Sequence, residues 1–253
     1  MDARRDPPDQ CAGGADGITD RPPGRSAVIS VALIGPDGAG KSTISALLES
    51  EPLPAPVKRI YMGVNLQASG LMLPTTRLAL AVKTARGRRA DMTAPSATPA
   101  QDGGSAARRA VKGTARGVRL VMWLAEEWFR QLVATYHRRR GAIVVFDRHF
   151  YADYYHADVA SDRRTLSSRV HGFLLEHAYP KPDLVICLDA PGDVLFERKH
   201  EASAEWLERR RHQYLQLASA VPHFAIVNAD RPLDVVTHDV ATVIAEFVEK
   251  RRA

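Results

Sequence analysis

The stretch that decides the fold is "ALIGPDGAGKST", which runs from Ala32 to Thr43. Within it, Gly35 to Ser42 fits the pattern G-x-x-x-x-G-K-[ST] of a phosphate-binding loop. The continuous apolar run Ala27–Ile34 precedes the motif and predicts a buried parallel strand. A helix is predicted directly after it, over Lys41–Glu49. The motif therefore stands between a strand and a helix, which is the context that it requires.

Each residue type in this loop has a physical reason. Gly35, Gly38 and Gly40 allow backbone conformations that a Cβ atom would block, so that successive N–H groups converge on phosphate oxygens. Lys41 supplies a positive charge to the β- and γ-phosphates, and Ser42 offers a hydroxyl ligand to Mg²⁺. The loop therefore predicts a site for a nucleoside triphosphate, which we take to be ATP. The nucleotide-binding residues predicted in it are Gly35, Asp37, Gly38, Ala39, Gly40, Lys41, Ser42 and Thr43.

Four further apolar runs predict strands that alternate with amphipathic helices. The strands are expected over Val57–Met62, Ala142–Asp147, Asp183–Asp189 and His223–Ala229. The helices are expected over about Val118–Arg140, Thr165–Ala178, Asp193–Lys199, Glu205–Ala220 and Leu233–Lys250. This alternation predicts an α/β fold of three αβα layers, with a five-stranded parallel sheet covered on both faces. Ligands of such a sheet bind beyond the carboxyl ends of its strands.

Length and composition indicate one main domain. The chain has 253 residues, 45% of them apolar, which is enough for one α/β core over residues 27–253. Residues 1–26 are rich in Asp, Arg, Pro and Gly and predict a disordered head. No apolar run approaches the roughly 20 residues of a membrane span, so we expect a cytoplasmic protein with no membrane partner. Cys11 and Cys187 lack metal-ligand spacing, and Cys187 is expected to be an ordinary core residue.

The net charge of +6 is localised. Basic residues exceed acidic ones by six between Arg86 and Arg119, so the rest of the chain is neutral. Residues 86–117 have few large apolar side chains and predict a flexible basic insertion. Because most charge runs of this kind are solvated, specific binding of nucleic acid is not predicted.

A second group of candidate functional residues stands at the end of the run "AIVVFD", whose last residue begins the stretch "DRHF" (Asp147–Phe150). If this strand neighbours the first, Asp147 supports the Mg²⁺ hydration shell or orients an acceptor, and Arg148 grips an anionic substrate. The alternative is a structural Asp–Arg pair that closes the strand. The segment from Gly35 to Lys41 holds no arginine, so further positive charge for phosphoryl transfer must come from elsewhere. The candidates are Arg198, Lys199 and the run Arg209–Arg211, although solvation of the helix surface is the preferred interpretation for Arg210 and Arg211.

Four motifs together resemble a known family. The stretches "GPDGAGKST", "DRH", "PDLVICLDAPGDVLFERK" and "RRRHQYLQLA" are similar to the P-loop, DR-aromatic, fourth-strand and lid-helix motifs of thymidylate kinases and their relatives. The resemblance covers roughly Ala27–Lys250, outside the basic insertion. It implies a nucleoside-monophosphate-kinase fold with a lid at about residues 198–212. It also implies a homodimer and transfer of the ATP γ-phosphoryl, with Mg²⁺, to a nucleoside monophosphate.

The resemblance also implies individual roles. Asp37 would contact the sugar hydroxyl of the acceptor and Arg148 its phosphate, while Arg198 and Lys199 would lie in or near the lid over ATP. Asn228 and Arg231 would lie beside the adenine. The predicted acceptor-binding residues are therefore Asp37, Arg148, His149 and Tyr151, the catalytic residues are Lys41, Asp147, Arg148 and Arg198, and the metal ligands are Ser42 and Asp147. The segment His149–Asp158 either lines the acceptor pocket or packs its aromatic side chains under a loop.

The helix before "DRHF" departs from the family pattern. Glu126 occupies the place of an arginine that helps thymidylate kinases to recognise thymine, and a carboxylate there would favour an acceptor with hydrogen-bond donors, such as an amino-base or a sugar. Glu126 and Arg130 stand four residues apart and are expected to form a weak surface pair. The apolar residues at helical spacing are expected to be core rather than a base-stacking platform. They are Val121, Leu124, Trp128, Leu132 and Tyr136.

Two further functions stay open at this point. One is a kinase of the same fold that acts on a nucleoside or a sugar. The other is an ATP-binding regulatory protein in which the nucleotide changes the shape of the basic insertion for a partner.

Overall fold

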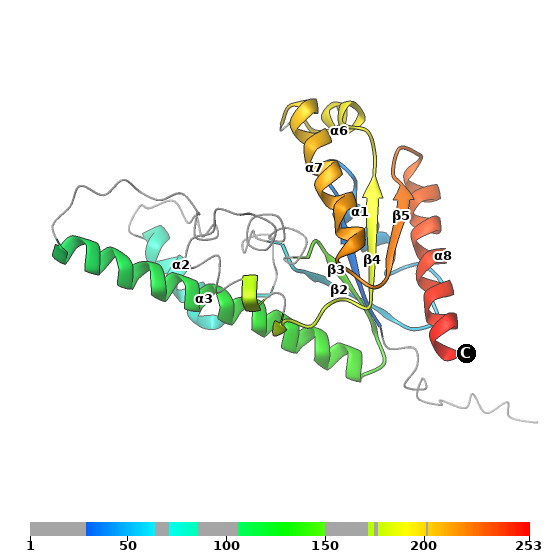
Figure 1. Ribbon diagram of the computed structural model, residues 1–253. Helices are drawn as coiled ribbons and strands as arrows, with labels where there is room; N and C mark the ends of the chain where they lie inside the picture. Colours follow the sequence, from blue (N-terminus) through cyan, green and yellow to red (C-terminus); the bar gives the residue numbers. More distant parts are fainter. Residues whose placement is uncertain (1–28, 64–70, 86–105, 150–171, 175–176, 201) are drawn as a thin grey trace, which may run out of the picture.

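The computed structural model describes residues 29–63, 71–85, 106–149, 172–174, 177–200 and 202–253. Its strands are β1 (Ser30–Ile34), β2 (Val57–Tyr61), β3 (Ile143–Asp147), β4 (Leu184–Asp189) and β5 (Phe224–Asn228). They pair in parallel in the order β2-β3-β1-β4-β5 (Figure 1). The five-stranded parallel sheet predicted from the sequence is therefore confirmed.

Most of the predicted helices are also present. They are α1 (Lys41–Leu47), α6 (Gly192–Lys199), α7 (Ala204–Gln216), which continues into a 3₁₀ turn at Leu217–Ser219, and α8 (Leu233–Arg252). Most of the helix expected over Thr165–Ala178 lies outside the described residues. One helix was not expected from the sequence, namely α2 (Pro74–Ala85).

The helix α3 (Ala106–Arg139) begins well before the predicted start at Val118. Residues 106–117 of the predicted basic insertion are therefore helical, and the flexibility of the insertion stays a prediction. The segment "AARRAVKGTARG" lacks large apolar side chains but is rich in Ala and Arg, which have high helix propensity. Residues 86–105 and the predicted head lie outside the described residues. In Figure 1, α3 extends far beyond the sheet, with α2 beside it.

The sheet separates two apolar clusters. Val31 and Leu33 of β1 point to the face covered by α1 and α8, whereas Ala32 and Ile34 point to the face covered by α3 and α7. This alternation follows from the two-residue period of a strand. All five residues of β1 are buried, and so are all five of β3, as expected for central strands of a sheet with helices on both faces. Cys187 is 1% exposed in the second cluster, which confirms its predicted core role.

The prediction for α3 is wrong about which residues face the core. Val121 and Leu132 are each 65% exposed, and the side chains of Trp128 and Tyr136 are also exposed. The buried face of α3 passes instead through Trp123. The other buried residues of α3, which recur about once per helical turn from Trp123, are Glu126, Glu127, Arg130, Gln131 and Ala134. The face of α3 that packs inward is therefore partly charged, and its partners belong to the site described below.

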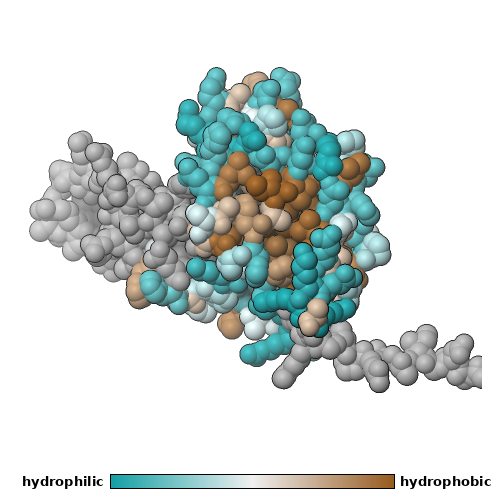
Figure 2. Space-filling view, turned by 45° about the vertical axis from the view of Figure 1, so that its right-hand side comes forward, coloured by the Kyte–Doolittle hydropathy of each residue, from teal (hydrophilic) through white to brown (hydrophobic). Residues whose placement is uncertain are grey.

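The two edges of the sheet differ in character. The edge strand β2 carries the exposed side chains of Lys58 and Arg59, which discourage pairing with another chain. The edge strand β5 carries no charge, and Ile226 on it is 58% exposed. Figure 2 turns this side of the molecule forward and shows apolar side chains gathered near its middle. Among the described helices, none is long and apolar enough to cross a membrane.

Gly35 provides a test of the fold at the sheet's carboxyl edge. A Cβ atom at Gly35 would lie 2.5 Å from the carbonyl oxygen of Leu188, and the φ of Gly35 is +139°. We expect Gly35→Ala to lower the free energy of unfolding by about 1–3 kcal/mol, because both the contact and the φ value disfavour a side chain. Urea denaturation at pH 7 measures this.

Gly117→Ala is the matched control. No atom lies within 4 Å of a Cβ placed at Gly117, which stands in α3. Replacing a helical glycine by alanine should raise the free energy of unfolding by up to about 1 kcal/mol. Equal effects of the two substitutions would contradict the close approach of the loop to β4.

Candidate functional site

The loop Gly35–Gly40 follows β1 and turns sharply into α1. Gly35, Gly38 and Gly40 all have positive φ values, of 139°, 91° and 87°. Gly40 is the N-cap residue of α1 and makes no side-chain capping hydrogen bond. The first N–H groups of a helix have no partners within the helix, so this turn presents donors of the kind that bind anions. The three glycines predicted to allow unusual backbone conformations therefore do adopt positive φ values.

Lys41 and Ser42 lie at the start of α1, next to the end of β3. The Lys41 side chain is 5% exposed, and its Nζ donates to the carbonyl oxygens of Gly35, at 2.7 Å, and Pro36, at 2.6 Å. The Ser42 Oγ donates to Oδ1 of Asp147 over 3.1 Å. Ser42 and Asp147 meet because β1 and β3 are neighbouring strands, as their predicted joint role needs. The strands pair with Leu33 opposite Asp147.

Ser42 and Asp147 fit the requirements of Mg²⁺. The ion prefers oxygen ligands and usually keeps several waters while it binds one or two protein groups and the phosphates of the substrate. A hydroxyl and a carboxylate within hydrogen-bond distance of each other are such a pair. A denser cluster of His, Cys, Asp or Glu that could hold a metal does not occur in the described part of the chain. The pair therefore suits a metal that is carried in with a nucleotide.

Arg148 and Asp37 form an ion pair in front of the loop. Nη2 of Arg148 lies 2.6 Å from Oδ1 of Asp37, and both side chains are partly exposed. Arg148 has a φ of 65°, a left-handed conformation that is uncommon for residues other than glycine. Burial alone would raise the pKa of Asp37, but the charges of Arg148, Lys41 and Lys199 outweigh burial and hold the pKa below its usual value. Asp37 is therefore an ionised carboxylate at neutral pH.

The hairpin of α6 and α7 stands over this group, and Arg211 fastens it to β4. Nε and Nη2 of Arg211 donate to the two carboxylate oxygens of Asp189, at 2.6 and 2.9 Å. Nη1 of Arg211 donates to Glu208, whose other oxygen accepts from the N–H of Gly192 at the start of α6. The interpretation of Arg211 as a merely solvated residue is therefore wrong. It is a structural residue that joins α7 to the sheet.

Arg198 faces the loop after β5 rather than the phosphate-binding loop. Its Nη1 donates to the carbonyl oxygen of Ala229 over 3.0 Å. In the same loop, Oδ1 of Asn228 accepts from the N–H of Asp230, and Arg231 forms an ion pair with Asp239. The structure thus brings Arg198 together with the segment that was predicted to pass by the adenine. The catalytic role of Arg198 stays a prediction.

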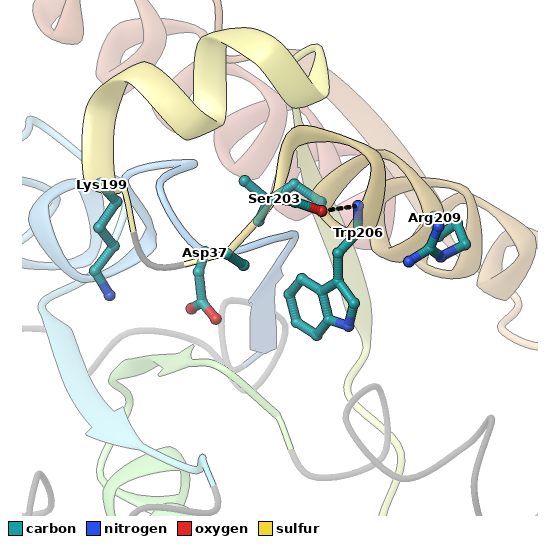
Figure 3. Close-up of a pocket in the computed structure, with 7 residues that line it drawn as sticks. Asp37, Lys199, Ser203, Trp206 and Arg209 are labelled. Atoms are coloured by element: carbon teal, nitrogen blue, oxygen red, sulfur yellow. Dashed lines mark hydrogen bonds between the residues drawn. The ribbon is translucent and has the colours of Figure 1, made fainter.

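A cavity of about 510 Å³ lies between Asp37 and the α6–α7 hairpin. Lys199, Trp206 and Arg209 line it from the hairpin (Figure 3). Figure 3 shows the side chains of Asp37, Lys199 and Trp206 extending to the same side. Trp206 was not singled out in the sequence, although an aromatic residue next to the basic run Arg209–Arg211 could have drawn attention.

Glu126 and Arg130 are buried and do not form the expected surface pair. Oε1 of Glu126 accepts from the N–H of Leu73, just before α2, over 2.9 Å. Nη1 of Arg130 donates to the carbonyl oxygen of Gly63, just after β2, over 3.1 Å. The two side chains, one helical turn apart, therefore hold both ends of the connection between β2 and α2. Oε2 of Glu126 is buried and finds no hydrogen-bond partner among the described residues.

His149 lies inside the molecule. Its side chain is 2% exposed and packs edge-on against Phe146, with ring centroids 5.1 Å apart. Burial lowers the pKa of His149 to about 3. The ring is therefore neutral at pH 7, and its predicted contact with an acceptor stays a prediction. Tyr151 and nearly all of the segment His149–Asp158 lie outside the described residues.

Comparison with known proteins confirms the resemblance to thymidylate kinases. The thymidylate kinase of Methylococcus capsulatus is 36% identical over 118 residues, which are 42% of this chain and 55% of that protein. A probable thymidylate kinase of Archaeoglobus fulgidus is 28% identical over 120 residues, 44% of this chain and 58% of that protein. The thymidylate kinase of Alteromonas mediterranea is 34% identical over 79 residues, 28% of this chain and 36% of that protein.

The chain thus spans about half the length of the first two of these relatives. No protein-family model matches it. Among solved structures, a deoxyadenosine kinase from M. mycoides with bound dATP matches with a TM-score of 0.48 and 14% identity, covering 85% of this chain and 98% of that one.

The buried His149 predicts a pH dependence of stability. Its pKa is about 3 in the folded protein and about 6.5 when unfolded, so the unfolded state takes up the proton first as the pH falls. Stability is therefore complete above pH 6.5 and is lost toward pH 3, by about 1.4 kcal/mol per pH unit from this group. We expect His149→Gln to lose about 2 kcal/mol less than the wild type between pH 8 and pH 5.

Urea denaturation at several pH values measures this difference. His238→Gln, which removes an exposed imidazole from α8, is the control and should keep the slope of the wild type. An unchanged slope in His149→Gln would show that the imidazole is not buried as described.

Proposed function

We propose that the protein is an ATP-dependent phosphotransferase similar to thymidylate kinase, which transfers the γ-phosphoryl of ATP to a nucleoside monophosphate. The observation that carries the proposal is the convergence of Lys41 and the Ser42–Asp147 pair with the Asp37–Arg148 pair at one edge of the sheet. Lys41 and the Ser42–Asp147 pair suit the polyphosphate of a donor with its metal. The Asp37–Arg148 pair suits an anionic acceptor with a sugar hydroxyl. The similarity to curated thymidylate kinases supports the same activity.

In the proposed reaction, a phosphate oxygen of the acceptor forms a bond to the γ-phosphorus. The bond from that phosphorus to the β–γ bridging oxygen breaks, and its electron pair leaves with ADP. The N–H groups of the loop and the Nζ of Lys41 would hold the β- and γ-phosphates. Ser42 and Asp147 would hold Mg²⁺, which neutralises charge on the phosphates when bound.

Arg148 would bind the phosphate of the acceptor, and its forked donors suit this task. Asp37 keeps Arg148 in place and, as an ionised carboxylate, can accept a hydrogen bond from a sugar hydroxyl. Arg198 and Lys199 belong to the α6–α7 hairpin, which would act as the lid of a domain over residues 27–253. Asn228 and Arg231 would lie beside the adenine. The homodimer and the cytoplasmic location remain predictions.

Offering acceptors directly tests the proposal. Purified protein with Mg-ATP should form ADP in the presence of at least one nucleoside monophosphate, and mass spectrometry should find the matching diphosphate. Lys41→Ala should reduce this turnover at least about 100-fold, because it removes a positive charge from the phosphates.

Two results would contradict the proposal. A product formed from a nucleoside or a sugar would favour the kinase of another acceptor. Tight binding of ATP without transfer to any acceptor would favour the regulatory protein.

Arg148 provides a more specific prediction. Arg148→Ala should lower kcat/KM for the acceptor roughly 10- to 100-fold, the range of a charged hydrogen bond, and leave the KM for ATP within about twofold. Arg139→Ala is the control, because Arg139 is exposed at the end of α3. Steady-state kinetics with each substrate varied in turn measures both values. Equal losses for ATP and acceptor would indicate instead that the end of β3 has collapsed.

A further inference from the structure

The cavity under the α6–α7 hairpin combines positive charge with one aromatic surface. Lys199 and Arg209 contribute cations, and Asp37, which is already paired with Arg148, contributes the carboxylate. The balance of charge therefore favours an anionic ligand. Trp206 is the aromatic residue among the described side chains that line the cavity, and its side chain is 41% exposed. Its indole and Asp37 extend to the same side in Figure 3.

Trp206 is held in place from within α7. The backbone N–H of Trp206 donates to Oγ of Ser203, the N-cap residue of α7. The guanidinium of Arg210 lies 5.8 Å from the centre of the Trp206 ring and 5.1 Å from that of Tyr214. Arg210 also donates to the hydroxyl of Tyr214, which is buried in the core. Trp206, Arg210 and Tyr214 thus lie one helical turn apart along the same face of α7. Their contacts orient the indole of Trp206 while it remains exposed.

The helix α3 carries exposed aromatic side chains, but none of its described residues lines this cavity. Glu126, at the place of the thymine-recognising arginine, is fully buried and holds the N–H of Leu73. Trp128 stacks on Tyr179 with ring centroids 5.1 Å apart. None of these α3 residues is among the described residues that line the cavity. Among the described residues that line the cavity, an aromatic contact for a flat ring therefore comes from α7.

We infer that Trp206 contacts the base of the acceptor and makes this cavity selective for a nucleotide over a sugar phosphate. The inference rests on the proposed function and deepens it. Asp37 would meet the sugar hydroxyl on one side of the cavity, and the indole would meet the attached base. Stacking of a base on an aromatic side chain tolerates different bases, so Trp206 selects for a base without fixing which one.

The test measures kinetics of the full chain with Mg-ATP and with dTMP, dCMP, dAMP and dGMP as acceptors. Trp206→Ala should raise the KM of the best acceptor about fivefold or more, which is the low end of the effect known for lost base stacking. Trp206→Phe should stay within about threefold of the wild type, because it keeps an aromatic ring. In Trp206→Ala the KM for the acceptor should rise by a larger factor than the KM for ATP.

Two controls separate base contact from a general loss of structure. Tyr136→Ala removes an aromatic residue of similar exposure from α3, away from the cavity, and should behave as the wild type. Deoxyribose 5-phosphate, which lacks a base, should inhibit the wild type and Trp206→Ala with the same Ki. The inference is wrong if Trp206→Ala and Tyr136→Ala give the same KM, or if the Ki rises as much as the KM.

The result also distinguishes this inference from the proposed function. If the wild type phosphorylates no nucleoside monophosphate, both the proposed function and the role of Trp206 are wrong. If it does and Trp206→Ala keeps its KM, only the role of Trp206 falls. Should Trp206→Ala fail to fold, tryptophan fluorescence decides, because quenching by the acceptor must be present in the wild type and absent in Trp206→Phe. Quenching that persists in Trp206→Phe would overturn the inference.

Discussion

The parallel pairing of β1 with β3 is the constraint on which the rest of the site depends. Leu33 stands opposite Asp147 in this pairing, so the carboxylate at the end of β3 falls beside Ser42 in the first turn of α1. The register is fixed by burial, because both strands have apolar clusters on each face. A slip by one residue would turn every side chain of β3 to the opposite face. The packing of the core thereby sets the position of the groups that suit a metal-bound triphosphate.

The electrostatics of the site follow from an excess of cations around one carboxylate. Asp37 is partly buried, which disfavours its charge, yet Arg148, Lys41 and Lys199 keep its pKa low. The proposed reaction needs such an excess, because its two anionic substrates would otherwise repel each other. In this arrangement Asp37 holds Arg148 where the proposed acceptor would bind. The pair costs little stability and supplies preorganisation, because it is exposed enough for water to screen it.

The sequence predicted the structure correctly where the local pattern of apolar residues matches the way the element packs in the fold. The apolar runs predicted all five strands, and the glycine spacing predicted the turn around Gly35–Gly40 with its positive φ values. It was misleading for α3, where helical spacing alone could not tell which face packs inward. Glu126 and Arg130 are buried because backbone groups at the two ends of the β2–α2 connection meet them, and no local pattern records such distant partners. The cavity facing Trp206 was missed for the same reason.

The run Arg209–Arg211 shows how a helix divides one residue type among three tasks. Successive residues of an α-helix point about 100° apart, so three neighbouring arginines cannot serve the same ligand. Arg209 lines the cavity, Arg210 lies against Trp206 and Tyr214, and Arg211 binds Asp189 with two hydrogen bonds. Arg211 thus anchors the hairpin to β4 and Arg210 orients the indole of Trp206. Arg209 contributes its charge to the cavity. In the proposed lid, the anchored arginine and the oriented indole would keep the charge of Arg209 and the aromatic ring in place before a substrate binds.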